Sequence, residues 1–357
     1  MADLLKKAME VGFDKRQKPS MLLSNMFKTK LLRTTKVEVQ GRVVKSIYSV
    51  DVKLGTGGRR VELSSYDKKE FTIPEYNNFD IISEEDIFKV QLGETEYNQQ
   101  IANIANLIND KQIPISDMQK RAVEKQASDA LFQGKIVLTG GTEIKFNKKD
   151  THTISKSTAK WNGTSGDPIK DIGDACKLCI EDGLLTATVF NFFAGDDVLN
   201  ALLKNENFRE NADANKGIKR SDIGIPEEQV PGGVYHGRIS VGSSLVNIWT
   251  YNEKYTIPTG YDFAGEGTTV SYIPAGCALL VPVNPNFTKY YAAINNVNAP
   301  SGIGGSKLQL VETEQLPYAY DELVDGSAIT KAGVKSRPLC VPVDVDCFAT
   351  FKDLCNV

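Results

Sequence analysis

Residues 37–66 alternate apolar and polar side chains, and this pattern predicts a long β-hairpin. The apolar positions are mainly β-branched: Val37, Val39, Val43, Val44, Ile47, Val50 and Val52. Such residues favour extended backbone. The turn is expected at the glycine-rich residues 55–58, after which Val61 and Leu63 lead back. A two-stranded ribbon is only marginally stable in water, so a long hairpin needs another surface to lie on, and that surface can belong to another chain.

A helical period follows over residues 94–133. The apolar face begins with Ile101, Ile104, Leu107 and Ile108. Pro114 interrupts this face, and Ser116 with Gln119 three positions later matches a capping box. The pattern therefore predicts either one long helix with a kink or two helices in tandem, ended by Gly134.

The middle of the chain predicts a strand pair and then a linker. Residues 136–138 and 142–146 are extended segments on either side of a Gly-Gly turn. Residues 147–166 are polar and rich in Gly, Ser and Thr, which is typical of a linker or a surface loop. The extended segments at 71–74 and 79–82 precede the helix.

The character changes after Pro168. Residues 169–180 have an amphipathic helical pattern, 184–190 resemble a buried strand, and 196–204 form a second short helix. This order predicts an α/β-type second domain, so the fold class of the whole chain is α+β. Residues 339–351 partly alternate and predict a terminal strand that returns to an earlier sheet. A weak helical period also covers residues 2–12.

Composition excludes several classes of protein. The chain has 357 residues, of which 41% are hydrophobic and 24% charged, so it can bury a sizeable core and is not globally disordered. The apolar runs are far shorter than the roughly 20 residues of a membrane span. The N-terminal sequence has no signal-peptide pattern. Six cysteines are too sparse for a disulfide scaffold, and we expect them to be reduced.

The charge is nearly balanced, which argues against a protein that grips nucleic acid over its whole surface. The net charge is -3, from 42 basic and 45 acidic side chains. Residues 1–36, however, hold nine Lys and Arg against three acids. This segment is either a solvated arm or an arm that lies against a negative surface, on a neighbouring subunit or on packaged nucleic acid.

The residues that could carry chemistry do not form a recognisable site. Cys176 and Cys179 form a lone CxxC on the apolar face of a predicted helix, which favours core packing over a zinc or redox site. His152 and His236 are the only histidines, and each is isolated. The glycines of residues 302–305 lack the spacing of a phosphate-binding loop. We assign no catalytic, cofactor-binding or metal-binding residue, and none to the paired carboxylates at 344 and 346.

The order of these parts resembles the tailed-bacteriophage major capsid proteins, and in particular the lambda-type capsid protein E family of the Hong Kong 97-like fold. Five segments carry the resemblance: the entry to the hairpin at 22–44, the FTIPEY stretch at 71–76, the helix end ASDALFQGKIVLTG at 127–140, residues 161–210 with the run VFNFFAGDD, and the closing strand at 337–351. Each motif is weak alone, and their order and spacing carry the signal. The hairpin tip and residues 214–335 match poorly.

The resemblance implies an extended architecture. Residues 1–36 would form an N-terminal arm and 37–68 the extended β-hairpin loop. Residues 69–166 with 336–357 would form a peripheral domain around a long spine helix, and 167–335 an axial α/β domain. The hairpin tip then supplies candidate contacts between subunits, namely Gly55, Gly57, Gly58, Arg59 and Arg60. The two arginines would meet carboxylates of a neighbour or would simply be solvated.

The resemblance also implies a function. The protein would be a structural protein without enzymatic activity, and many copies would form the icosahedral head shell around double-stranded DNA. Its partners would be further copies of itself in hexamers and pentamers, with scaffolding, portal and decoration proteins as possible additions. It would be part of the virion, assembled in the host cytoplasm, and would need no cofactor, membrane or small-molecule substrate.

Two other classes stay open from the sequence. One is a baseplate-type phage structural or binding protein with an extended ribbon, which would form small oligomers in place of shells. The other is an α/β hydrolase that uses residues 167–335 and His236. The size of the assembled particle separates the first alternative from a shell protein, and a substrate screen with a His236 variant tests the second.

Overall fold

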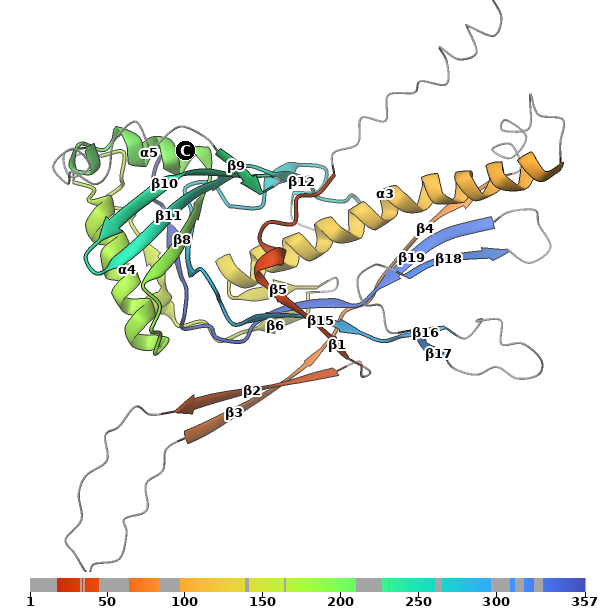
Figure 1. Cartoon of the computed structure of the whole chain (residues 1–357), viewed down its shortest axis with the longest axis horizontal. Coiled ribbons are helices and arrows are strands. Elements are labelled where there is room, and N and C mark those ends of the chain that lie inside the picture. The colour runs from red at the N-terminus through yellow and green to blue at the C-terminus, as the bar shows by residue number, and fades with distance from the viewer. Residues whose placement is uncertain are drawn as a thin grey trace, which may run out of the picture.

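The computed structural model describes residues 18–32, 34, 36–44, 64–83, 97–138, 141–163, 165–209, 227–230, 232–260, 265–296, 309–311, 318–323 and 330–356. The predicted helix at 2–12, the hairpin tip and the glycines at 302–305 lie outside these residues. The fold consists of a seven-stranded sheet with its helices, a long helix α3 with smaller sheets beside it, and a two-stranded ribbon (Figure 1).

The largest sheet is mixed, and it gathers strands from distant parts of the chain. Its order is β7 (Thr153–Ser155), β21 (Ala349–Lys352), β14 (Ala278–Pro282), β8 (Val189–Ala194), β11 (Ser244–Tyr251), β10 (Gly233–Val241) and β9 (Glu227–Val230). Strands β8 and β11 are parallel, as are β7 and β21, while the other neighbours are antiparallel. Two of its strands, β7 and β21, come from ranges that the sequence placed in the peripheral domain.

The two faces of this sheet bury separate cores, because successive side chains of a strand point to opposite faces. Phe192 of β8 packs toward α4 (Pro168–Asp182) and α5 (Asp196–Lys204), together with Trp161. The next residue, Phe193, packs in a second core with Leu131 of α3 (Tyr97–Phe132). Figure 1 accordingly shows α4 and α5 on one side of the sheet and α3 on the other.

Helix α3 is the spine of the molecule, and smaller strands line its length. A three-stranded sheet joins β1 (Lys28–Leu32), β15 (Phe287–Ala292) and β20 (Pro338–Pro342), and a second one joins β18 (Tyr318–Leu323), β19 (Thr330–Ser336) and β4 (Tyr76–Ile82). The remaining pairs are β5 (Lys135–Val137) with β6 (Glu143–Lys145), β12 (Lys254–Thr256) with β13 (Thr269–Ser271), and β16 (Ile294–Asn296) with β17 (Gln309–Val311). Two short 3-10 turns, η1 (Ser24–Met26) and η2 (Asp150–His152), complete the elements used below.

The prediction of a long helix is confirmed, but the capping box inside it is wrong. Helix α3 runs without interruption from Tyr97 to Phe132 and contains Pro114. Ser116 therefore lies in mid-helix. The Gln119 side chain does not reach back to a cap, since it is buried and donates to the Val334 carbonyl of β19 at 2.6 Å. Packing against β19 and β20 outweighs the local signals for a helix start. Gly134, with φ of 68°, follows the helix end as expected.

Residues 147–166, predicted as a linker or a surface loop, are largely irregular and at least partly exposed, but they do not form a linker. Strand β7 lies within this range and pairs with β21 in the large sheet. Trp161 is fully buried, and its indole N–H donates to Asp171 of α4 at 2.9 Å. The polar composition was misleading because polar groups of this segment form hydrogen bonds with other parts of the fold. Trp161 alone anchors the segment in the apolar core.

Two strand predictions also need correction. The strand expected at 184–190 is β8, which begins only at Val189, while Leu184 is exposed and has φ of 49°. The single terminal strand at 339–351 is in fact two strands, β20 and β21, in different sheets. Asp344 and Asp346 lie in the connection between them, so they do not share a strand face as predicted.

Candidate functional site

The clearest extended feature is the ribbon of β2 (Lys36–Val44) and β3 (Ser64–Thr72) (Figure 1). The two strands pair antiparallel with continuous register from Lys36 opposite Thr72 to Val44 opposite Ser64. Among the strands that the structure describes, neither pairs with a third one. The hairpin predicted from the sequence is therefore confirmed at its base. The candidate contact residues Gly55, Gly57, Gly58, Arg59 and Arg60 lie outside the described residues and stay predictions.

Among the ribbon side chains that the structure describes, those at the root contact the body. Val37 is buried, and the ring of Phe71 lies 5.6 Å from that of Phe146 between centroids. At the same level, Lys36 and Glu70 form a 2.9 Å ion pair, with side chains 61% and 59% exposed. Figure 1 shows the strands projecting away from both sheets. A ribbon held at one end presents both of its faces to whatever lies beside it.

A second candidate surface is the outer face of the β18–β19–β4 sheet. On β4, Ile82 is buried and Asp80 pairs with Lys111 of α3 at 3.0 Å, whereas Phe79 and Ile81 are 50% and 47% exposed. The ammonium group of Lys331 on β19 lies 5.2 Å from the centre of the Phe79 ring. We call Phe79, Ile81 and Lys331 the exposed sheet face. Two large apolar side chains on one open face are a typical mark of a contact surface.

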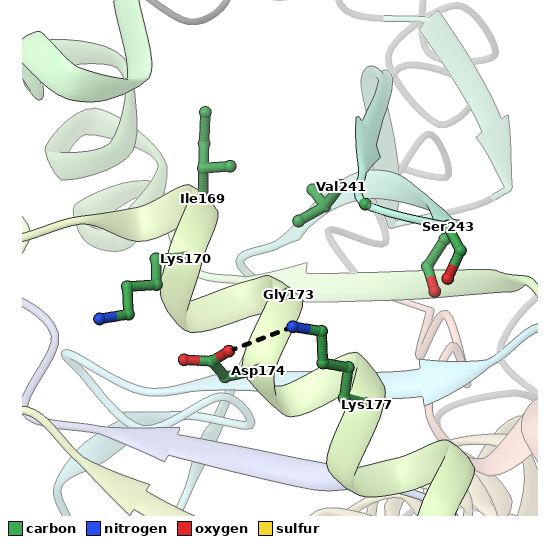
Figure 2. A pocket seen from close by; sticks show the side chains of 9 residues that line it. Ile169, Lys170, Gly173, Asp174, Lys177, Val241 and Ser243 are labelled. Atoms are coloured by element: carbon green, nitrogen blue, oxygen red, sulfur yellow. Dashed lines mark ion pairs between the residues drawn. The ribbon is translucent and has the colours of Figure 1, made fainter.

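The pocket in Figure 2 does not have the composition of an active site. It measures about 180 Å³ and lies between the first half of α4 and the β10–β11 turn. Its lining residues are Ile169, Lys170, Gly173, Asp174, Lys177, Val241, Gly242, Ser243 and Ser244. Figure 2 shows the Lys177 amine directed at Asp174, at 3.9 Å, in an exposed pair along one helix. Such pairs are common on solvated helix faces.

His236, the candidate base of the hydrolase alternative, is 8% exposed on β10. Its Nε2 contacts the Thr250 hydroxyl at 2.7 Å, and burial lowers the pKa of the ring. Thr250 is itself 2% exposed, so this pair does not open onto a surface where a substrate could reach it. The second histidine, His152, is fully buried at a different place in the fold.

The cysteines behave as core residues. All six are free thiols, and five are buried. Burial raises the pKa of Cys176 and Cys179 to about 12, so these thiols are unreactive at neutral pH. Both belong to the core between α4 and the large sheet, which confirms the packing interpretation of the CxxC.

Within the described part of the chain, no group of three or more His, Cys, Asp or Glu side chains could hold a metal ion. No helix among the described residues is long and apolar enough to cross a membrane.

A buried carboxylate that no local pattern predicted holds the segment before β1. Glu124 of α3 is fully buried, and it accepts the backbone N–H groups of Leu23 at 2.7 Å and Ser24 at 2.9 Å. The Tyr251 hydroxyl lies 3.0 Å from the same carboxylate and 2.9 Å from that of Glu253. Burial raises the pKa of Glu124. These contacts fix the segment before β1 against the spine helix.

This arrangement of spine helix, ribbon and flanking sheets defines a class of shell-forming structural proteins with the Hong Kong 97-like capsid fold. Solved structures of that fold are similar over nearly the whole chain. The capsid protein assigned to a prophage of E. coli CFT073 has 16% identity and a TM-score of 0.59, with 98% of both chains covered. The capsid protein of cyanophage P-SCSP1u has 9% identity and a TM-score of 0.51, with 96% of this chain and 91% of that chain covered.

A family model described as phage major capsid protein E matches residues 13–352, and the chain belongs to this family. It is thus a phage major capsid protein, a component of the virion, and many copies of it form the icosahedral shell of the head. The resemblance and the fold class inferred from the sequence are confirmed. A search of curated protein sequences found no match.

Proposed function

We propose that the shell is held together by the ribbon of one subunit, residues 37–68, lying over the next subunit, with the exposed sheet face as part of the surface that it meets. The ribbon has no third strand among the described residues, and a two-stranded ribbon is marginal alone. The sheet face offers apolar area at Phe79 and Ile81. Burial of both surfaces against a neighbour supplies the stabilisation that each lacks within one subunit.

The proposed division of labour follows the predicted regions. Residues 1–36 form the arm, 69–166 with 336–357 the peripheral part, and 167–335 the axial part, whose loops meet at the five-fold and six-fold axes. Strands β7 and β21 connect the peripheral ranges directly to the axial sheet. The peripheral and axial parts would therefore share the seven-stranded sheet.

The proposed contents and partners rest on charge and composition. A net charge of -3 suits a wall that contains double-stranded DNA without binding it tightly or by sequence. The subunits form hexamers and pentamers in the host cytoplasm, with scaffolding, portal and decoration proteins as further partners. The buried histidines and thiols support a role without catalysis.

The observation that carries the proposal is the unsupported ribbon, and a deletion tests it. Removing residues 53–62 should block shell formation in electron micrographs while the remainder of the chain stays folded, as measured by circular dichroism. The double substitution Arg59→Ala with Arg60→Ala tests the charged part of the tip, and Lys145→Ala, an exposed lysine of β6, is the matched control. Normal closed shells from the deletion variant would rule out the role proposed for the tip.

A further inference from the structure

A short segment before β1, residues 20–24, lies against the spine helix and against one end of the large sheet. We call it the anchored segment. The Ser20 hydroxyl lies 3.2 Å from that of Tyr251, the last residue of β11. An added Cβ at Gly232, just before β10, would lie 2.5 Å from the Ser20 Cβ. The glycine therefore leaves room for the anchored segment to pack directly on the sheet.

Two buried carboxyl groups hold the anchored segment. The Glu253 carboxyl accepts the Ser20 N–H at 3.1 Å and also contacts the Ser20 hydroxyl. The Glu124 carboxyl accepts the N–H groups of Leu23 and Ser24. Glu124 has no exposed surface, and Glu253 is 9% exposed. Neither forms an ion pair with a lysine or arginine among the described residues, so two negative charges here would be buried without a cation bonded to them.

Tyr251 lies between the two carboxyl groups. Its hydroxyl oxygen is 3.0 Å from Oε1 of Glu124 and 2.9 Å from Oε2 of Glu253. A phenol has one proton to donate, and an ionised carboxylate can only accept. If both glutamates were ionised, Tyr251 would bond to one of them, and the other would face the phenol oxygen with no proton between. One further proton, on either carboxyl, gives both contacts a hydrogen bond.

The surroundings of this cluster favour a proton over a second charge. The Tyr272 ring stacks on that of Tyr251, with centroids 6.0 Å apart, and both rings are buried. Burial raises the pKa of Glu124 and that of Tyr251, so the phenol keeps its own proton. The titratable and charged groups around the two carboxyls are Tyr251 of β11, Tyr255 of β12, Tyr272, Cys340 of β20 and Arg121 of α3, with Asp129 of α3 and Lys289 of β15 behind them.

We propose that Glu124 and Glu253 share one proton through Tyr251, and that this proton fastens the anchored segment to the spine helix and the large sheet. With the proton in place, hydrogen bonds run from one carboxyl to Tyr251 and from Tyr251 to the other. Without it, two negative charges lie on either side of one hydroxyl.

The direction of the pH effect follows from burial. A carboxyl whose pKa is raised by folding stabilises the folded chain fully below its pKa in the unfolded chain, and this contribution is lost as the pH rises through the folded value. The shared proton therefore holds the anchored segment at neutral pH, and base loosens it.

Infrared spectra of purified shells in heavy water at neutral pH detect the proton directly, because a protonated carboxyl has a carbonyl band that a carboxylate lacks. The wild type should be compared with Glu253→Gln and Glu124→Gln. In either variant, two backbone or hydroxyl donors and the Tyr251 hydroxyl are left to one carboxylate, which then needs no proton. Each single substitution should therefore remove the same band, although it leaves one of the two carboxyls in place.

The infrared control is Asp344→Asn, which removes a different carboxyl whose pKa is raised by burial and should keep the band of the pair. A band that survives Glu253→Gln would mean that Glu124 is protonated by burial alone. A band that survives Glu124→Gln would assign the proton to Glu253 alone. Either result, or no such band in the wild type, would overturn the shared proton.

Hydrogen exchange tests the hold on the anchored segment and does not depend on the Glu124 variant. The Leu23 and Ser24 amides are followed at pH 7 and pH 10, corrected for intrinsic rates, in shells of Lys148→Met, so that Lys148 does not titrate. Their protection should fall by about tenfold or more, and it should fall less when Glu253→Gln is added. Other titrating groups are common to both proteins and cancel. An equal response in the two proteins would refute the proposal.

Discussion

Replacement of Glu124 by glutamine tests how the spine helix holds the start of the fold. The carboxylate receives two backbone N–H groups, from Leu23 and Ser24, one on each oxygen. Glutamine has nearly the same shape, but one of its two terminal atoms is an NH₂ group. Whichever way the amide is turned, that NH₂ group faces one of the two backbone N–H groups, and the two donors cannot bond.

The cost follows from the burial of the groups involved. Glu124, Leu23 and Ser24 have no exposed surface, so water cannot replace the missing acceptor. A buried donor left without a partner costs about 1–3 kcal/mol. We therefore expect Glu124→Gln to lower the free energy of unfolding by about 2 kcal/mol. The matched control is Glu143→Gln, because Glu143 is a surface carboxylate that pairs with Lys135 at 2.6 Å and Lys145 at 3.1 Å. Its replacement should change the free energy of unfolding far less than Glu124→Gln, because solvent screens exposed ion pairs.

Urea titrations of the subunit, followed by tryptophan fluorescence, measure both variants. A second readout is tryptic cleavage after Lys28, which should accelerate in Glu124→Gln because β1 follows the anchored segment directly. If the two variants unfold at the same urea concentration, or if cleavage after Lys28 does not change, the anchoring role of Glu124 is wrong.

Two further predictions concern charge and assembly. Burial lowers the pKa of Lys148 to about 7 from an ordinary value of 10.5, so between these values the unfolded chain binds a proton that the folded chain does not. Lys148 should therefore contribute a rise of the free energy of unfolding with pH, by up to about 1.4 kcal/mol per pH unit, and Lys148→Met should lower the slope by that amount between pH 7 and 8.5, below the range in which the thiols of the unfolded chain ionise; equal slopes for the two proteins in urea titrations over this range would refute the reasoning. Phe79→Ser should lower the yield of closed shells several-fold in sucrose gradients, whereas Val283→Ser, at a similarly exposed apolar position outside the exposed sheet face, should not. Equal yields from the two variants would exclude Phe79 from the assembly surface.

Much of the architecture could be read from local pattern. The hairpin, the long helix and the pair β5–β6 follow from alternation, helical period and glycine placement, because each of these patterns is complete within one stretch of sequence. The core position of Cys176 and Cys179 follows from the same helical period. The exposure of Phe79 and Ile81 could not be predicted in this way, because their alternation with Asp80 would place them on the buried face of a strand.

The wrong predictions concern segments whose structure depends on contacts with residues distant in the sequence. The local sequence marks Ser116 as a helix start, but contacts between α3 and β19 keep the helix continuous there. The local sequence of residues 147–166 favours a linker or a surface loop, but pairing with β21 makes part of this range strand β7. Glu124 and Glu253 are single polar residues in the sequence. Their roles depend on Leu23 and Ser20, which lie 101 and 233 positions away, and no local pattern reports contacts of that range.

The position of β21 has a consequence for synthesis of the protein. This strand fills the gap between β14 and β7, and its partners are made long before it. In a nascent chain that ends before Phe348, the edge of β14 has no strand beside it. Both cores are also incomplete, since Phe351 belongs to one core and Phe348 to the other. A polypeptide released before this strand is translated therefore cannot complete the large sheet or its two cores. Only subunits translated past this strand can join a growing head.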